Sequence, residues 1–142
     1  MSTFLYPNSG ALAIAGLVQA GLASAVVKLF KSNIDLAPTT AVADLDAIEC
    51  DFSGYGAKTI TAFNDPYLAD AGGASISSGY IQWDWVAPTP PDPEVENSVY
   101  GFYMVDAGGA LICAGKFDTP LPMGFVGQSV PLTVTLNYGA GA

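Results

Sequence analysis

The sequence predicts a mainly β protein, an antiparallel β-sandwich of about seven strands that follows a short N-terminal helix. After residue 24 the chain consists of short runs rich in Val, Ile, Thr and aromatic residues, separated by Gly, Pro, Asn or Asp. Within residues 129–138, apolar side chains at every second position predict a strand with one buried face. Before residue 25, apolar residues recur at helical spacing instead.

The length and composition suit one domain. The 142 residues are 51% hydrophobic and only 12% charged, so the chain can bury a core without disulfides or metals. We expect an N-terminal helical or arm segment at residues 1–24 and a single β-sandwich domain at residues 25–142. The low charge favours self-association or docking, because an isolated domain usually carries more charge on its surface, and we expect a homo-oligomer.

The N-terminal segment predicts a short helix over about residues 10–23, capped by Asn8 or Ser9. Its apolar residues share one face at i, i+3, i+4 and i+8: Ile14, Leu17, Val18 and Leu22. Small residues elsewhere on the helix would let another backbone approach closely. Internal glycines, a glutamine and the lack of a basic start argue against a membrane span or a signal peptide.

Seven segments of the remaining chain predict strands: residues 25–31, 47–52, 56–63, 79–87, 98–106, 110–117 and 129–138. Pro131 predicts that the last strand lies at a sheet edge, because proline has no N–H to donate. Segment 98–106 is apolar on both sides, since two alternating sets fill it: Tyr100, Phe102 and Met104, and Val99, Tyr103 and Val105. Such a strand is either central in its sheet or covered by another subunit.

Residues 88–97 are rich in proline and acidic side chains and cannot form a regular ladder, so we expect an exposed extended loop. This loop either only connects two strands or reaches a neighbouring subunit in polyproline form.

Asp-Ala-Gly-Gly occurs at residues 70–73 and again at 106–109. The second copy lies between two predicted strands and predicts a tight turn. Repeated use of good turn residues explains this similarity as well as an internal duplication does.

The charge of the chain excludes several classes of function. Thirteen acidic residues against four lysines give a formal net charge of −9, and the sequence contains no arginine and no histidine. Nucleic acids and anionic membranes are therefore disfavoured, and we expect neither as a partner, because both attract Lys and Arg. Without histidine, Ser-His-Asp and Cys-His catalysis and His-ligated metal sites are also excluded. Carboxylate chemistry or binding remains.

Carboxylates gather at four positions: Asp44, Asp46, Glu49 and Asp51. We interpret this group as the solvated beginning of a strand. Two alternatives are a calcium site, although the spacing does not fit an EF-hand loop, and the acid and nucleophile of a glycosidase.

The only cysteines, Cys50 and Cys113, match no metal-binding spacing, and free thiols are favoured over a disulfide.

Three large apolar side chains share one face of the strand predicted at 79–87: Ile81, Trp83 and Trp85. Aligned aromatic side chains of this kind can stack on sugar rings or anchor a protein partner. More often they belong to the core. We favour the core for Trp83 and Trp85, with one of the two reaching a subunit boundary.

The order of segments resembles small structural proteins of tailed bacteriophages, described as virion, head-decoration or tail-associated components. The stretches that carry this resemblance span most of the chain: residues 27–33, 38–40, 42–45, 50–55, 99–106, 116–120 and 132–136. They are patterns of turns and strands with no catalytic signature. Residues 88–97 are longer and richer in proline than that pattern needs.

The resemblance implies a non-enzymatic virion protein without cofactor or metal, which decorates or stabilises the outer capsid through oligomeric docking. The expected partners are the major capsid protein, other virion subunits and sister copies. A net charge of −9 would be repelled by packaged DNA, so we expect the outer surface of the head, or the tail. The expected contact residues are Leu12, Ile14, Leu17, Val18, Leu22, Trp83, Trp85, Pro90, Pro91, Tyr100 and Phe102.

Two alternatives to capsid decoration remain. The first is a tail ring or fibre-base component, in which the same strands would pack head to tail. The second is a carbohydrate-binding or carbohydrate-cleaving module that would use Trp83, Trp85 and the four carboxylates.

Overall fold

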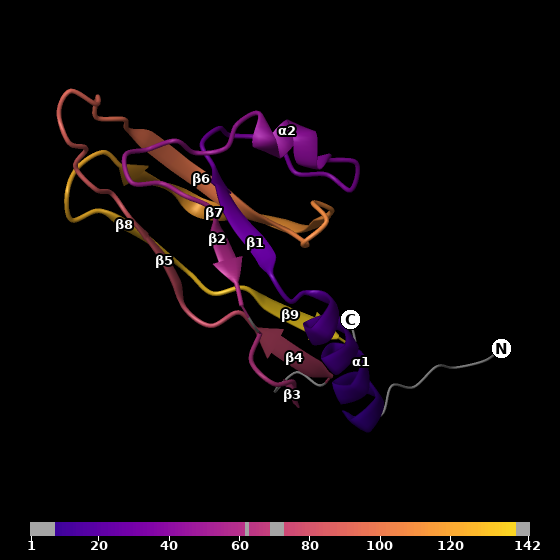
Figure 1. The fold of residues 1–142 in the computed structure, drawn as a ribbon. Helices are drawn as coiled ribbons and strands as arrows, with labels where there is room; N and C mark the ends of the chain where they lie inside the picture. Colours follow the sequence, from indigo (N-terminus) through magenta and orange to yellow (C-terminus); the bar gives the residue numbers. More distant parts are fainter. Residues whose placement is uncertain (1–7, 62, 69–72, 139–142) are drawn as a thin grey trace.

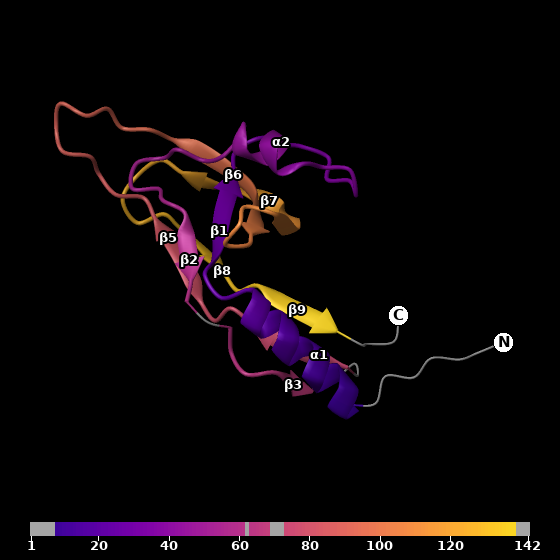
Figure 2. The ribbon, with the colours of Figure 1, turned by 45° about the vertical axis from the view of Figure 1, so that its right-hand side comes forward.

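The computed structural model describes residues 8–61, 63–68 and 73–138. These residues form a mainly β fold, as predicted, with three antiparallel sheets (Figures 1 and 2). In chain order the elements are α1 (Asn8–Gly21), β1 (Ala25–Phe30), α2 (Val42–Asp46), β2 (Lys58–Ile60), β3 (Tyr67–Leu68), β4 (Ala74–Ser77), β5 (Ile81–Asp84), β6 (Asn97–Val105), β7 (Leu111–Met123), β8 (Ser129–Leu132) and β9 (Thr135–Tyr138).

The largest sheet has four strands in the order β2-β1-β6-β7. Strand β6 lies in its interior between β1 and β7, so segment 98–106 takes the first of its two alternatives, the central position. The register shifts between Val99 and Gly101, which turns both Val99 and Phe102 toward the main core. Gly101 is required in this strand because a Cβ there would overlap the carbonyl oxygen of Gly115 and the ring of Phe30.

Two apolar clusters cover the two faces of this sheet. The main core joins its inner face, including Val27, Leu29 and Met104, to Trp83 and Val130 of the β5–β8 ribbon. On the outer face, Phe30, Tyr103 and Val105 form a second cluster with Leu45 of α2, which lies over this face with the chain before it (Figure 1). The four-stranded sheet is therefore sandwiched between the β5–β8 ribbon and the segment that contains α2.

A small sheet in the order β3-β4-β9 extends the molecule away from this sandwich, and α1 packs against it (Figure 2). Ala11 and Ala15 are fully buried there, since their small side chains let the helix approach β4 closely. Figure 1 shows α1 at one end of the molecule and the loop that joins β5 to β6 at the opposite end.

Some predicted boundaries were wrong. The strand predicted at 47–52 does not form: α2 and a turn occupy this region, with a single bridge between Phe30 and Glu49. The Asp44 carboxylate accepts a hydrogen bond from the backbone N–H of Ala41 at 3.1 Å and so caps the start of α2. Val42, Leu45 and Ile48 recur at helical spacing and pack on the outer face of the large sheet.

The C-terminal strand predicted at 129–138 is divided. Strand β8 pairs with β5, whereas β9 pairs with β4 in another sheet. At the break, the N–H of Val134 donates to the Ser78 hydroxyl at 3.0 Å, and the Ser78 N–H donates to the Val134 carbonyl at 2.9 Å. Val130 and Val134 are nevertheless both buried, so the predicted inward face persists across the break. Strands β3 and β4 were not predicted, and β7 extends beyond the predicted 110–117.

The second Asp-Ala-Gly-Gly copy forms the predicted turn between β6 and β7. The Asp106 carboxylate accepts the N–H groups of Gly108 and Ala110, each at 2.9 Å, and Gly109 adopts a φ of 89°. Most of the first copy, residues 69–72, lies outside the described residues.

Candidate docking surface

The helix α1 buries a different face from the one predicted. Its most deeply buried residues are Ala11 and Ala15, and Leu22 directly after its end is also buried, with Leu12 and Val18 half-buried against the main core. Leu17, expected on the apolar face, is instead 75% exposed. The helix rotates in this way because alanines at 11 and 15 allow a closer approach to β4 than the Ile14–Leu17 side would. Of the five residues of this N-terminal segment expected at an interface, Leu17 alone is a large exposed side chain.

Both tryptophans belong to the core, which is the alternative favoured for them by the sequence. Trp83 is 1% exposed and donates its indole N–H to the carbonyl of Gly56 at 2.8 Å. Trp85 is 4% exposed and donates to the carbonyl of Val95 at 3.0 Å. Neither ring is available for stacking on a sugar or on a partner, so these two expected contact residues are corrected to core residues.

Tyr100 and Phe102 are half-buried within this chain. Phe102 stacks on Phe117 of β7 with ring centroids 6.4 Å apart, and Tyr100 packs on the outer-face cluster. Their burial follows from the central position of β6 and requires no second subunit.

Pro90 and Pro91 lie in the exposed part of the loop between β5 and β6, where residues 89–94 are all exposed. The tip contains a turn in which the Asp92 N–H donates to the carbonyl of Thr89 at 3.1 Å. Val95 fixes the base of the loop, because its N–H donates to the Ser53 hydroxyl at 2.8 Å and its carbonyl accepts the indole N–H of Trp85. The loop therefore projects from a rigid base (Figure 1).

A second loop lies beside that base and was not singled out in the sequence. In the turn between β7 and β8, Phe125 is 63% exposed and Val126 is 68% exposed. The Gln128 side chain accepts the N–H groups of Gly124 at 2.6 Å and Phe125 at 3.2 Å, and this holds the turn. The available signal was two apolar residues between Gly124 and Gly127 where turns normally carry polar side chains.

The two loops meet at one end of the molecule. The N–H of Trp85 donates to the carbonyl of Gln128 at 3.1 Å, and Glu96 lies against Gly124. A recess of about 360 Å³ lies beside this contact, lined by residues that include Glu96, Asn97, Met123 and Phe125. We call Val86, residues 88–96 and residues 124–128 the loop end.

Another recess, of about 410 Å³, lies between the chain before α2 and the start of β7. Leu36, Pro38, Ile112 and Cys113 are among its lining residues. Ile112 is partly exposed there, but the recess brings no cluster of charged or hydrogen-bonding side chains together.

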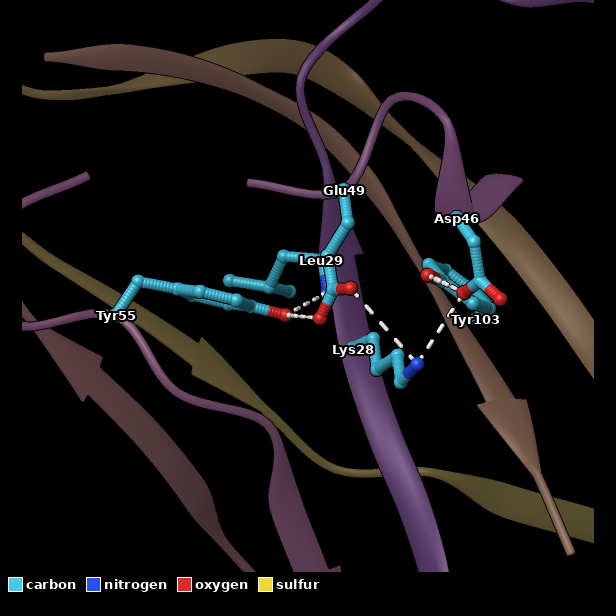
Figure 3. A network of polar contacts seen from close by, with 6 residues as sticks. All are labelled: Lys28, Leu29, Asp46, Glu49, Tyr55 and Tyr103. Carbon is cyan, nitrogen blue, oxygen red and sulfur yellow. Dashed lines mark hydrogen bonds and ion pairs between the residues drawn. The ribbon is translucent and has the colours of Figure 1, made fainter. Parts of the chain in front are cut away.

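The four carboxylates do not form one site. Asp46 accepts hydrogen bonds from the Tyr103 hydroxyl at 2.6 Å and from the Lys28 ammonium at 3.2 Å (Figure 3). Glu49 accepts the Tyr55 hydroxyl at 2.8 Å and lies 3.8 Å from the same ammonium. The Tyr55 hydroxyl also accepts the Leu29 N–H at 3.2 Å. The network fastens α2 and the turn after it to β1 and β6.

The other two carboxylates point elsewhere. Asp44 caps α2, and Asp51 pairs with Lys31 at 2.7 Å and accepts the Asn97 amide at 2.9 Å. Hydrogen bonds from Tyr103 and Lys28 lower the pKa of Asp46, and those from Lys31 and Asn97 lower the pKa of Asp51. These carboxylates stabilise the fold as anions. Among the described residues, no group of three or more His, Cys, Asp and Glu is placed to hold a metal ion.

Both cysteines are free thiols, as the sequence favoured. Burial raises the pKa of Cys50 to about 12 and also raises the pKa of Cys113. A thiol that stays protonated is a poor nucleophile, so neither cysteine is suited to covalent catalysis.

No helix in the described part of the chain has the length and apolar character needed to cross a membrane. Comparison with known proteins found no matching family model, no matching curated protein and no matching solved structure.

Proposed function

We propose that this chain is a non-enzymatic structural subunit of a tailed-bacteriophage particle and that it decorates or stabilises the outer surface of the head. The observation that carries this proposal is the loop end, where exposed apolar side chains and a projecting proline loop are held on a rigid base. The sequence resemblance to small phage virion proteins supports the same assignment. The net charge of −9 favours the outside of the shell over the DNA-filled interior.

Docking would work by removing apolar surface from water. Each square ångström of apolar surface buried contributes about 25 cal/mol before the cost of association is subtracted. Phe125 and Val126 supply such surface at the loop end, and Leu17 supplies it on α1 at the opposite end. A subunit with apolar contacts at both ends can bridge the major capsid protein and a neighbouring virion subunit or sister copy.

The carbohydrate alternative is weakened by the placement of its proposed residues. Both tryptophans are enclosed by the core, and the carboxylates are occupied by capping, ion pairs and hydrogen bonds.

Quantitative mass spectrometry of purified particles, from the phage or prophage whose genome encodes this sequence, tests the proposal. On the order of hundreds of copies per particle is the result expected for a head protein, because shells repeat one contact over many symmetric positions. A small multiple of three or six would place the chain in the tail. Complete absence from particles would overturn the virion assignment.

A further inference from the structure

We propose that the loop end is a docking surface for a protein partner that carries an apolar pocket framed by Lys and Arg side chains. This inference rests on the proposed function, because it specifies which surface of the virion subunit makes the contact and what chemistry the partner presents.

The apolar part of the loop end is preorganised. Phe125 and Val126 stand at the tip of a turn whose backbone N–H groups are held by the Gln128 side chain. Val86 is also exposed, and its N–H donates to the carbonyl of Ser53 at 2.9 Å. Because these backbones are already fixed in the free chain, docking would order little additional backbone. Aromatic side chains displayed in this way commonly fill a pocket on the partner.

The charged part of the loop end is acidic throughout. Asp92, Glu94 and Glu96 are exposed, and no lysine occurs in residues 86–96 or 124–128. Among the described residues, the ion pairs involve only Lys28 and Lys31, whose acceptors are Asp46, Glu49 and Asp51. Three unneutralised carboxylates beside an apolar tip complement a basic rim around an apolar pocket.

The same charges argue against other occupants. A second copy of this chain also carries −9, and its ion pairs already engage two of its four lysines. Nucleic acid and anionic bilayers present the same sign of charge as the loop end. A basic protein surface is therefore the occupant that the electrostatics favour.

Selection from a displayed library of random 12-residue peptides tests the proposal, because the loop end itself then selects the chemistry that it binds. The full chain is the bait, and a Phe125→Ser/Val126→Ser variant removes peptides that bind elsewhere. We expect the recovered peptides to combine Lys or Arg with an aliphatic or aromatic residue. A synthetic peptide of that sequence should bind the double variant at least about tenfold more weakly than the unmodified chain.

Matched variants separate the apolar from the charged contribution. Tyr80→Ser removes an exposed aromatic side chain outside the loop end and should leave the affinity unchanged. Glu94→Gln/Glu96→Gln should weaken binding about three- to tenfold and reduce its dependence on salt concentration. Asp35→Asn/Asp118→Asn removes two exposed carboxylates outside the loop end. This variant should change neither the affinity nor its dependence on salt concentration.

Three results would overturn the proposal: selected peptides that lack basic residues, equal binding to the Phe125→Ser/Val126→Ser variant, or no peptide that depends on the loop end. The substituted side chains are exposed, and circular dichroism confirms that each variant is folded before binding is compared. The outcome is distinct from that of the particle measurement. Absence from particles combined with loop-end binding would remove the virion assignment alone, whereas abundant copies without loop-end binding would remove this inference alone.

Discussion

The hydroxyl of Tyr103 donates a hydrogen bond to the carboxylate of Asp46 at 2.6 Å, joining the central strand β6 to the last residue of α2. The same carboxylate oxygen accepts Lys28 at 3.2 Å, and this ammonium lies 5.8 Å from the centroid of the Tyr103 ring. One carboxylate therefore connects three segments of the chain. Leu45, the neighbour of Asp46 in α2, is fully buried, so a polar contact and an apolar contact hold the same helix.

Replacing Tyr103 by Phe removes this hydrogen bond and keeps the buried ring. We expect the free energy of unfolding to fall by about 1–2 kcal/mol, because the variant loses a hydrogen bond to the ionised, partly exposed carboxylate of Asp46. Urea unfolding measures this change. Tyr80→Phe is the matched control, since its exposed hydroxyl contacts only Gln82 among the described residues. Equal losses in the two variants would show that the Tyr103–Asp46 contact adds nothing.

Acid should weaken the attachment of α2. Tyr103 and Lys28 lower the pKa of Asp46 below its ordinary value of 3.8 in the folded chain. The ionised carboxylate therefore contributes stability that is complete above the unfolded value and is lost as the pH falls through the folded one. We expect unfolding free energy to decrease below about pH 4, with a smaller decrease in Asp46→Asn. Denaturant titrations from pH 6 down to about pH 2 measure this pH dependence of the free energy of unfolding, with Asp35→Asn as the control. An unchanged pH dependence in Asp46→Asn would contradict the assignment.

Gly101 should tolerate no side chain. A Cβ at this position would overlap the Gly115 carbonyl oxygen and lie 2.5 Å from Cζ of Phe30, both inside the packed sheet. We expect Gly101→Ala to destabilise the fold by about 3 kcal/mol or more, or to prevent folding. Gly56→Ala is the control, since nothing lies within 4 Å of the added methyl group. Thermal unfolding of both variants gives the comparison, and a stable Gly101→Ala protein would show that β6 and β7 are spaced differently.

The two thiols should differ in accessibility. Cys50 is buried, with its pKa raised to about 12, whereas Cys113 is only half-buried beside a surface recess. We expect a thiol reagent to modify Cys113 slowly at neutral pH and to modify Cys50 only after unfolding. Mass spectrometry of the modified peptides measures both rates. Quantitative modification of Cys50 in the folded chain, or recovery of a Cys50–Cys113 disulfide, would contradict this arrangement.

The sequence predicted most strands because the signals that form them are local. Short runs of β-branched and aromatic residues specify β1 and β6, alternating apolar residues specify β8, and Asp106 with Gly109 specifies the turn between β6 and β7. The strand predictions failed where contacts between residues far apart in the sequence determine the structure. Residues 129–138 alternate without interruption, yet the hydrogen bonds between Ser78 and Val134 divide them between two sheets. Strand β4 depends on its pairing with β9, which no local pattern reveals.

The candidate site was predicted only in part for a related reason. The exposed prolines at 90 and 91 follow from composition alone, because prolines and acids in a row cannot form a ladder. The exposure of Leu17 and the burial of Trp85 depend on which surfaces the rest of the fold covers. Phe125 and Val126 became part of the loop end because Trp85 and Gln128 bring their turn beside the proline loop.

Reconstitution of particles measures directly whether this chain docks on a phage shell. Particles produced without this gene are incubated with increasing amounts of the purified chain, and the bound chain is measured after sedimentation. Saturable uptake at a stoichiometry set by particle symmetry, weakened by Phe125→Ser/Val126→Ser but not by Tyr80→Ser, is the predicted result. A chain that remains entirely in the supernatant at every concentration would contradict the account.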